Sequence, residues 1–360
     1  MLALVAVIDP SASSDPQHAL KSADSMQTTT GLSITGTRMI EQGDIGFTPH
    51  FASRLNSFRS ISPTRSSLDA LRMLANVPGI TATELNYPQH FSGPADRTLI
   101  TAARSMGLAV TALNLRFDPP QFAAGSLTHP DSQVRLVAIR LAHEALAIAV
   151  DTGIDHVILW LGPDGFDYPF QANLGALWQF AIEGVLAIAK REPGVKVSIE
   201  PKPSEPRRHS LVRGTSDALQ IVRETGLANV GVTLDFCHAL MAGESPAMAA
   251  AMALRDNRLF GVHLNDGYGT ADDGMTAGAV HPVQTLELLW VLRSAGWSGT
   301  IYFDTFPGHA DPSLECAANI SATRSLIASL DRVNPEELDH IQSQQDAIGA
   351  ARFASQLLTQ

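Results

Sequence analysis

The amino-acid sequence predicts an α/β fold: a single (β/α)8 TIM barrel with a short N-terminal extension and an extra C-terminal helix. From about residue 45, short β-branched or apolar runs alternate with longer segments of helical spacing, a rhythm typical of βα units around a parallel sheet. The 360-residue chain, 45% of it hydrophobic, also exceeds the length of about 250 residues that such a barrel needs.

Eight segments have the composition of buried strands, and this number favours closure into a barrel over an open sheet. The strands are predicted at Thr48–Asn56, Ile80–Asn86, Leu108–Phe117, His156–Leu161, Val195–Pro201, Val230–Phe236, Leu259–Asn265 and Thr300–Phe306. Amphipathic helices are predicted in the intervening and following segments, at Ser67–Ala75, Gln133–Val150, Leu177–Lys190, Ser216–Glu224, Val283–Ser294 and Glu315–Leu330.

Three segments are predicted along the chain. Residues 1–40 form an N-terminal extension, partly disordered, because residues 9–30 are rich in Ser, Asp, Gln and Thr without periodicity. Residues 41–332 form the catalytic barrel. Residues 333–360 form a helix in which Asn334 caps and Pro335 takes the first helical position. We expect this helix to pack on the barrel or on a neighbouring subunit.

Charge and cysteine content restrict the partners and the compartment. The formal net charge is −11 and no run of Lys and Arg could neutralise a series of phosphates, so we expect no nucleic-acid partner. The two cysteines, Cys237 and Cys316, cannot form a disulfide framework, which favours the cytoplasm. The apolar run Met1–Ile8 is too short to span a bilayer, so we expect no membrane association.

Four consecutive predicted strands end in, or close to, a residue that can bind a metal ion. These residues are Glu200, Asp235, His263 and Asp304. The carboxyl ends of barrel strands meet at one mouth, where three carboxylates would repel one another unless a cation were present. A single carboxylate at a strand end could instead cap the following helix, but His263 lies within an apolar strand. The set predicts a divalent cation: Mn, Mg, Co or Zn.

The same residues lie in motifs that resemble those of the xylose isomerase-like barrels, over about residues 80–310. The run Glu-Pro-Lys-Pro-Ser-Glu-Pro-Arg from Glu200 is similar to the fifth-strand motif of that family. The resemblance implies that Glu200 binds metal and that Lys202 contacts the sugar. The run Leu-Asp-Phe-Cys-His from Leu234 resembles the sixth-strand motif, which implies that Asp235 bridges two metals and that His238 binds the second.

Two further segments resemble the family, and two depart from xylose isomerase itself. Trp160 with the glycines that follow it is similar to the wall of the sugar pocket, and the segment around Asp304 is similar to the final metal-binding strand. His263 stands where xylose isomerase has an acidic ligand, which is closer to the L-rhamnose isomerase and tagatose epimerase branches. Asp272 and Asp273 are adjacent rather than spaced Asp-x-Asp, so we expect one of them to join His238 at the second metal.

Aromatic and amide side chains near the strand ends are candidates for binding a sugar. Trp160 and Phe166 follow the fourth strand, and Asn114 lies near the end of the third. Core, lid or turn roles are the alternatives for these three residues. The resemblance places His90 where a histidine helps to open the sugar ring, and a surface histidine is the alternative.

Three functions fit these observations. The first is a divalent-metal-dependent aldose–ketose isomerase acting on a small monosaccharide, in which a hydride shifts between C1 and C2. In this hypothesis Lys202 stabilises charge on the carbonyl oxygen, and a second metal near His238 and Asp272 moves a water molecule. The alternatives are a single-metal ketose epimerase of the tagatose epimerase type and a non-catalytic sugar-binding barrel. The resemblance implies a homodimer or a homotetramer.

Overall fold

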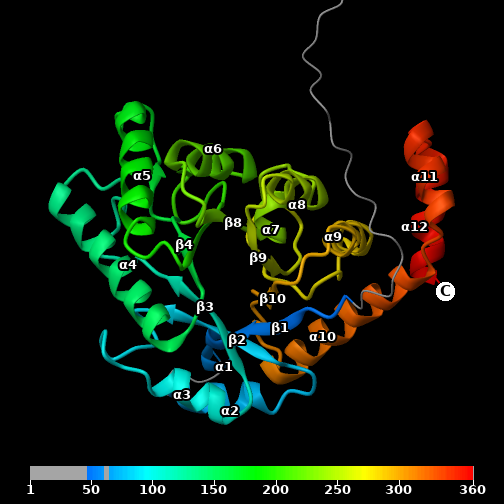
Figure 1. The fold of residues 1–360 in the computed structure, drawn as a ribbon, viewed down its shortest axis with the longest axis horizontal. Coiled ribbons are helices and arrows are strands. Elements are labelled where there is room, and N and C mark those ends of the chain that lie inside the picture. Colours follow the sequence, from blue (N-terminus) through cyan, green and yellow to red (C-terminus); the bar gives the residue numbers. More distant parts are fainter. Residues whose placement is uncertain (1–46, 61–64, 360) are drawn as a thin grey trace, which may run out of the picture. The chain divides into compact units, whose positions relative to one another are not determined.

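The structure is a computed structural model and describes residues 47–60 and 65–359. Eight parallel strands form its centre (Figure 1). They are β1 (His50–Arg54), β2 (Ala82–Tyr87), β3 (Ala109–Leu115), β4 (His156–Trp160), β6 (Lys196–Glu200), β8 (Val230–Asp235), β9 (Leu259–Leu264) and β10 (Thr300–Phe303). Each of these strands overlaps one of the segments predicted from the sequence.

The sheet closes on itself, because β1 pairs in parallel with both β2 and β10. Ala52 on β1 lies opposite Ala82 on one side and opposite Tyr302 on the other. The order around the barrel is β1-β10-β9-β8-β6-β4-β3-β2, so neighbours in the sequence are neighbours in the barrel. The predicted closed barrel is therefore confirmed.

Helices surround the strands, and at least one follows each barrel strand (Figure 1). In the described chain the outer helices are α2 (Ser67–Ala75), α3 (Thr98–Ser105), α4 (Ser132–Thr152), α5 (Leu174–Ala189), α6 (Thr215–Thr225), α8 (Pro246–Arg255), α9 (Pro282–Ser294) and α10 (Pro312–Ser329). Shorter elements are α1 (Leu55–Ser60), α7 (Phe236–Met241), the 3-10 helix Leu330–Arg332, and a two-stranded antiparallel ribbon of β5 (Gly165–Phe166) and β7 (His209–Ser210).

Polar side chains fill the barrel interior below its C-terminal end. Ser198 and Thr233 lie two residues before the strand ends Glu200 and Asp235, so they point to the same interior side. The Ser198 hydroxyl lies 2.6 Å from that of Thr233 and 2.7 Å from Nε2 of His156. All three side chains are buried. This hydrogen-bonded layer satisfies its own polar groups and supports the residues above it.

The C-terminal segment forms two helices rather than the single helix predicted. Asn334 caps α11 (Pro335–Gln344) and Pro335 takes its first position, as expected. The chain then breaks at Gln345, whose φ is 49°, and Asp346 accepts hydrogen bonds from the backbone at the start of α12 (Ala347–Thr359). Helix α12 packs against α9 and α10, on the outside of the barrel (Figure 1).

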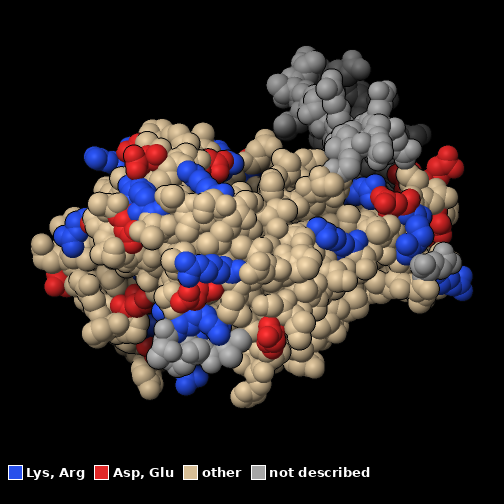
Figure 2. Space-filling view, turned by 90° about the horizontal axis from the view of Figure 1, so that it is seen from below, with Lys and Arg blue, Asp and Glu red and all other residues tan. Residues whose placement is uncertain are grey.

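The N-terminal extension predicted for residues 1–40 lies outside the described residues. Within the described residues, none of the helices has the length and apolar character needed to cross a bilayer. On the face drawn in Figure 2, Lys and Arg side chains alternate with Asp and Glu side chains.

Candidate metal centre and adjoining cavity

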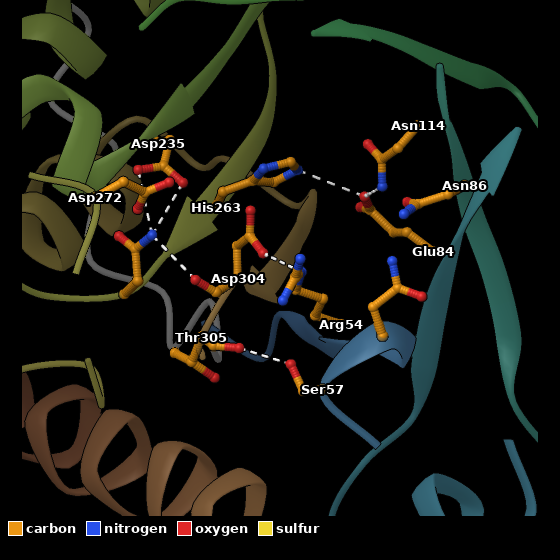
Figure 3. Close-up of polar contacts among 12 residues, drawn as sticks. Arg54, Ser57, Glu84, Asn86, Asn114, Asp235, His263, Asp272, Asp304 and Thr305 are labelled. Carbon is orange, nitrogen blue, oxygen red and sulfur yellow. Dashed lines mark hydrogen bonds and ion pairs between the residues drawn. The ribbon is translucent and has the colours of Figure 1, made fainter. Parts of the chain in front are cut away.

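Four side chains converge at the C-terminal mouth of the barrel. Glu200 and Asp235 are the last residues of β6 and β8, His263 lies within β9, and Asp304 directly follows β10. One ligand atom from each lies within 4.8 Å of the others. Figure 3 shows Asp235, His263 and Asp304 in one view, with the His263 ring directed toward Glu84 and the Asp304 carboxylate toward Arg54. The structure thus brings together the four residues that the strand-end pattern singles out.

The electrostatics of this cluster favour a cation. Glu200, Asp235 and His263 are each at most 6% exposed. Burial and the neighbouring carboxylates raise the pKa of Asp235 to about 7, although His238 opposes the shift. Burial also raises the pKa of Asp304. Both ring nitrogens of His263 are buried without a hydrogen bond among the described residues, and Oδ1 of Asp304 lies 3.1 Å from Nε of Arg54. These oxygen and imidazole donors fit a small divalent ion.

Asn265 holds two of the four ligands in place. Its amide nitrogen donates to Oδ2 of Asp235 at 3.0 Å and to the backbone oxygen of Asp304 at 3.1 Å. Its side-chain oxygen accepts from the backbone nitrogen of Cys237 at 2.8 Å. Asp235 also caps α7 by accepting from the backbone nitrogen of His238. The carboxylate of Asp235 is therefore fixed before any ion binds.

Glu84 is a site residue that was not anticipated from the sequence. It lies on β2, is 4% exposed, and its Oε2 is 3.5 Å from Nε2 of His263 (Figure 3). Nδ1 of His263 faces the opposite way, 3.4 Å from Glu200. Asn114 donates to Glu84 at 2.9 Å and does not line the cavity, so its role in sugar binding stays a prediction. Carboxylates in such positions commonly orient a metal-binding histidine.

A second group of charged residues lies beside the first. Oδ2 of Asp272 is 2.8 Å from Nζ of Lys202 and 3.2 Å from Nε2 of His238. Burial opposes the positive charge on both side chains, but nearby carboxylates outweigh it. Asp272 and Glu205 raise the pKa of Lys202, and Asp235 and Asp272 raise that of His238 to about 9. The adjacent Asp273 turns away and accepts from the backbone of Tyr268. Only one of the two aspartates therefore joins the site.

This second group lines a cavity next to the four ligands. The cavity has a volume of about 270 Å³ and is lined by Arg116, Trp160, Lys202, Glu205, His238, Asp272, Asp304 and Phe306. Asp304 belongs both to the ligand cluster and to the cavity wall. A side chain at Gly162 would lie 2.3 Å from the Trp160 ring, so the glycine leaves room for the indole to form one wall.

Two predicted site residues lie elsewhere. Nδ1 of His90 accepts from the backbone nitrogen of Asn86, and Nε2 donates to Asn56 at 2.9 Å. Burial and the nearby arginines lower the pKa of His90 to about 3, so the ring stays neutral. Phe166 stacks on His209 with the ring centroids 5.0 Å apart, in the ribbon of β5 and β7. Neither residue lines the cavity, and a role in ring opening or sugar binding stays a prediction.

Solved structures of sugar epimerases share this fold. A D-tagatose 3-epimerase-like protein superposes with a TM-score of 0.64 at 16% identity, covering 78% of this chain and 98% of that one. A D-psicose 3-epimerase from Clostridium cellulolyticum H10 superposes with a TM-score of 0.60 at 16% identity, covering 78% and 99% of the two chains. At this identity the likeness concerns the fold.

Sequence comparisons identify a family. A xylose isomerase from Thermus thermophilus is 27% identical over 194 residues, which cover 52% of this chain and 50% of the relative. The chain thus spans about half the length of the curated relatives it matches. The family model for the xylose isomerase-like TIM barrel matches residues 73–327, which is most of the chain. The chain therefore belongs to the xylose isomerase-like TIM barrel family.

Proposed function

We propose that the protein is a divalent-metal-dependent aldose–ketose isomerase that acts on a small monosaccharide. The observation that carries the proposal is the set of four ligand atoms within 4.8 Å of one another, with Asp304 shared by the ligand cluster and the cavity wall. A substrate in the cavity would lie directly against the ion. The similarity to a xylose isomerase supports the same chemistry.

A divalent ion held by Glu200, Asp235, His263 and Asp304 would supply Lewis acidity to the oxygens of a bound sugar. Lys202 supplies a second positive charge from the wall of the same cavity. Asp272 and Glu205 both pair with Lys202, and its pKa is raised despite burial. It therefore acts as a charged hydrogen-bond donor that stabilises negative charge on a carbonyl oxygen, and not as a base.

The aromatic walls have a separate role. Trp160, the last residue of β4, and Phe306, which follows β10, line the cavity. Apolar rings beside convergent polar groups suit the carbon faces and hydroxyls of a sugar, and they keep water from the reacting carbons. The volume of about 270 Å³ lies below the range usual for drug-sized ligands, which suits a monosaccharide.

An epimerase with a single metal is the second candidate, and one observation favours it. Among the described residues, the only cluster with metal-ligand spacing is the set of four, and His238 and Asp272 are outside it. Asp272 is instead neutralised by Lys202 and His238. A second ion on these residues stays a prediction, as do cytoplasmic location and assembly into dimers or tetramers.

Removal of one ligand tests the proposed metal site. Asp235→Asn should lower the affinity for Mn²⁺, measured by calorimetry on the chelator-treated protein, by more than the roughly 10- to 100-fold typical of outer contacts. Metal-dependent turnover of pentoses and hexoses should fall in parallel. Asp155→Asn is the control, because Asp155 pairs with Lys196 away from the cluster. Unchanged Mn²⁺ affinity in Asp235→Asn would show that the site is wrongly placed.

Replacement of the cavity lysine separates chemistry from metal binding. Lys202→Met should lower kcat by on the order of 100- to 1,000-fold, because a charged donor to the developing oxyanion is lost. The affinity for Mn²⁺ should change little, since Lys202 is not a ligand. Lys196→Met, at the exposed start of β6, is the matched control. Full kcat in Lys202→Met would exclude the role given to this residue.

Solvent deuterium distinguishes the two candidate reactions. An isomerase that shifts a hydride between C1 and C2 keeps the migrating hydrogen, so the product formed in D₂O should carry no carbon-bound deuterium. Proton abstraction and return by an epimerase would exchange that hydrogen with solvent. Mass spectrometry and proton NMR of the product measure the difference. Incorporation of about one deuterium per turnover would reject the hydride-shift isomerase and favour the epimerase.

A further inference from the structure

Among the described residues, one cation in the cavity wall, Arg116, forms no ion pair. Arg116 follows β3, and its backbone nitrogen donates to the oxygen of Tyr87 at 2.8 Å. Its guanidinium carbon lies 4.7 Å from the centroid of the Trp160 ring, and the side chain lines the cavity. Across residues 47–60 and 65–359, Arg116 has no ion pair and its guanidinium makes no hydrogen bond.

The neighbouring cations differ from Arg116 in this respect. Lys202, which also lies near the Trp160 ring at 5.9 Å, is paired with Asp272 at 2.8 Å. Arg54 is paired with Asp304 at 3.1 Å (Figure 3). The N–H donors of the Arg116 guanidinium therefore remain available to a molecule in the cavity, and the Trp160 ring stabilises the guanidinium through a cation–π contact.

The surroundings of Arg116 favour a carboxylate over a phosphate. A guanidinium matches the planar, singly charged carboxylate with two parallel hydrogen bonds. A phosphate dianion usually requires several donors, and here it would also meet the carboxylates of Glu205, Asp272 and Asp304, which line the same cavity. The single positive charge of Arg116 is neutralised by the single negative charge of a substrate carboxylate.

We propose that the substrate is a sugar acid of the uronate class, whose carboxylate pairs with Arg116. This inference rests on the proposed function and names its substrate. The aldehyde end of a uronate would face the four ligands and Lys202, while the carboxylate at the far end would reach Arg116. In the reaction a hydrogen moves with its electron pair from C2 to C1 and a proton moves from O2 to O1. The carboxylate is unchanged.

Matched sugars and variants test this assignment. The full-length protein loaded with Mn²⁺ is assayed with D-glucuronate, D-galacturonate and D-mannuronate, with the corresponding neutral hexoses, and with the hexose 6-phosphates. For at least one stereochemistry the uronate should exceed both others in kcat/KM, by about 10- to 100-fold over the neutral sugar, as expected for a charge-assisted pair. Arg116→Gln should reduce this ratio toward one, and Arg116→Lys should keep part of it.

Arg135→Gln is the control, because Arg135 stacks on Phe180 at 3.9 Å and does not line the cavity. It should leave the ratio unchanged. Equal or better turnover of the neutral sugars, or an Arg116→Gln effect that is the same for both classes, would overturn the inference. Preference for a 6-phosphate would overturn it as well.

Calorimetry separates this inference from the proposed function. Titration of the same uronates into the Mn²⁺-loaded protein measures binding without turnover. Binding that requires Arg116, in a protein that isomerises none of the sugars, would reject the isomerase and retain the acid-binding site. Turnover of neutral sugars without binding of any uronate would retain the isomerase and reject the acid-binding site.

Discussion

Mutual repulsion among three carboxylates, two buried and one partly buried, governs this site. Four strands direct Glu200, Asp235, His263 and Asp304 into one small space at the barrel mouth. Each carboxylate would cost several kcal/mol to bury as an isolated charge. Burial raises the pKa of Asp235 and Asp304, whereas His263 and His238 lower that of Glu200 to about 2. In the proposed function a divalent ion would balance the carboxylates, and the adjoining cavity would place a sugar against that ion.

The surrounding residues determine how each charge is held. Asn265 links Asp235 to the backbone of Asp304, and Glu84 stands behind His263 on the side away from Glu200. Farther out, Asp272 balances Lys202. Almost every charge at the mouth is therefore paired within the protein or directed at the metal site. The unpaired guanidinium of Arg116 is notable for this reason, since it leaves a defined place for a negative group of the substrate.

The predicted parts of the fold and site share one physical basis. The carboxyl ends of the parallel strands meet at one mouth of the barrel. A polar residue that ends an apolar run is therefore predicted to lie at this mouth, as Asp235 does. Contacts across the barrel lack such a signal. Glu84 lies inside the buried run of β2, and its contact with His263 depends on how the sheet closes. Whether Arg116 forms an ion pair depends on the positions of all the side chains around it. The break between α11 and α12 depends on the positive φ of one residue, Gln345.

Anomalous diffraction from crystals grown with Mn²⁺ would locate the metal ion. We expect a strong peak at the barrel mouth, within about 2.5 Å of a ligand atom from each of Glu200, Asp235, His263 and Asp304. Strands β6, β8, β9 and β10 should keep their positions as the ion binds. The absence of a peak there at saturating Mn²⁺, or a single peak held by His238 and Asp272 without His263, would show that these four residues do not form the metal site.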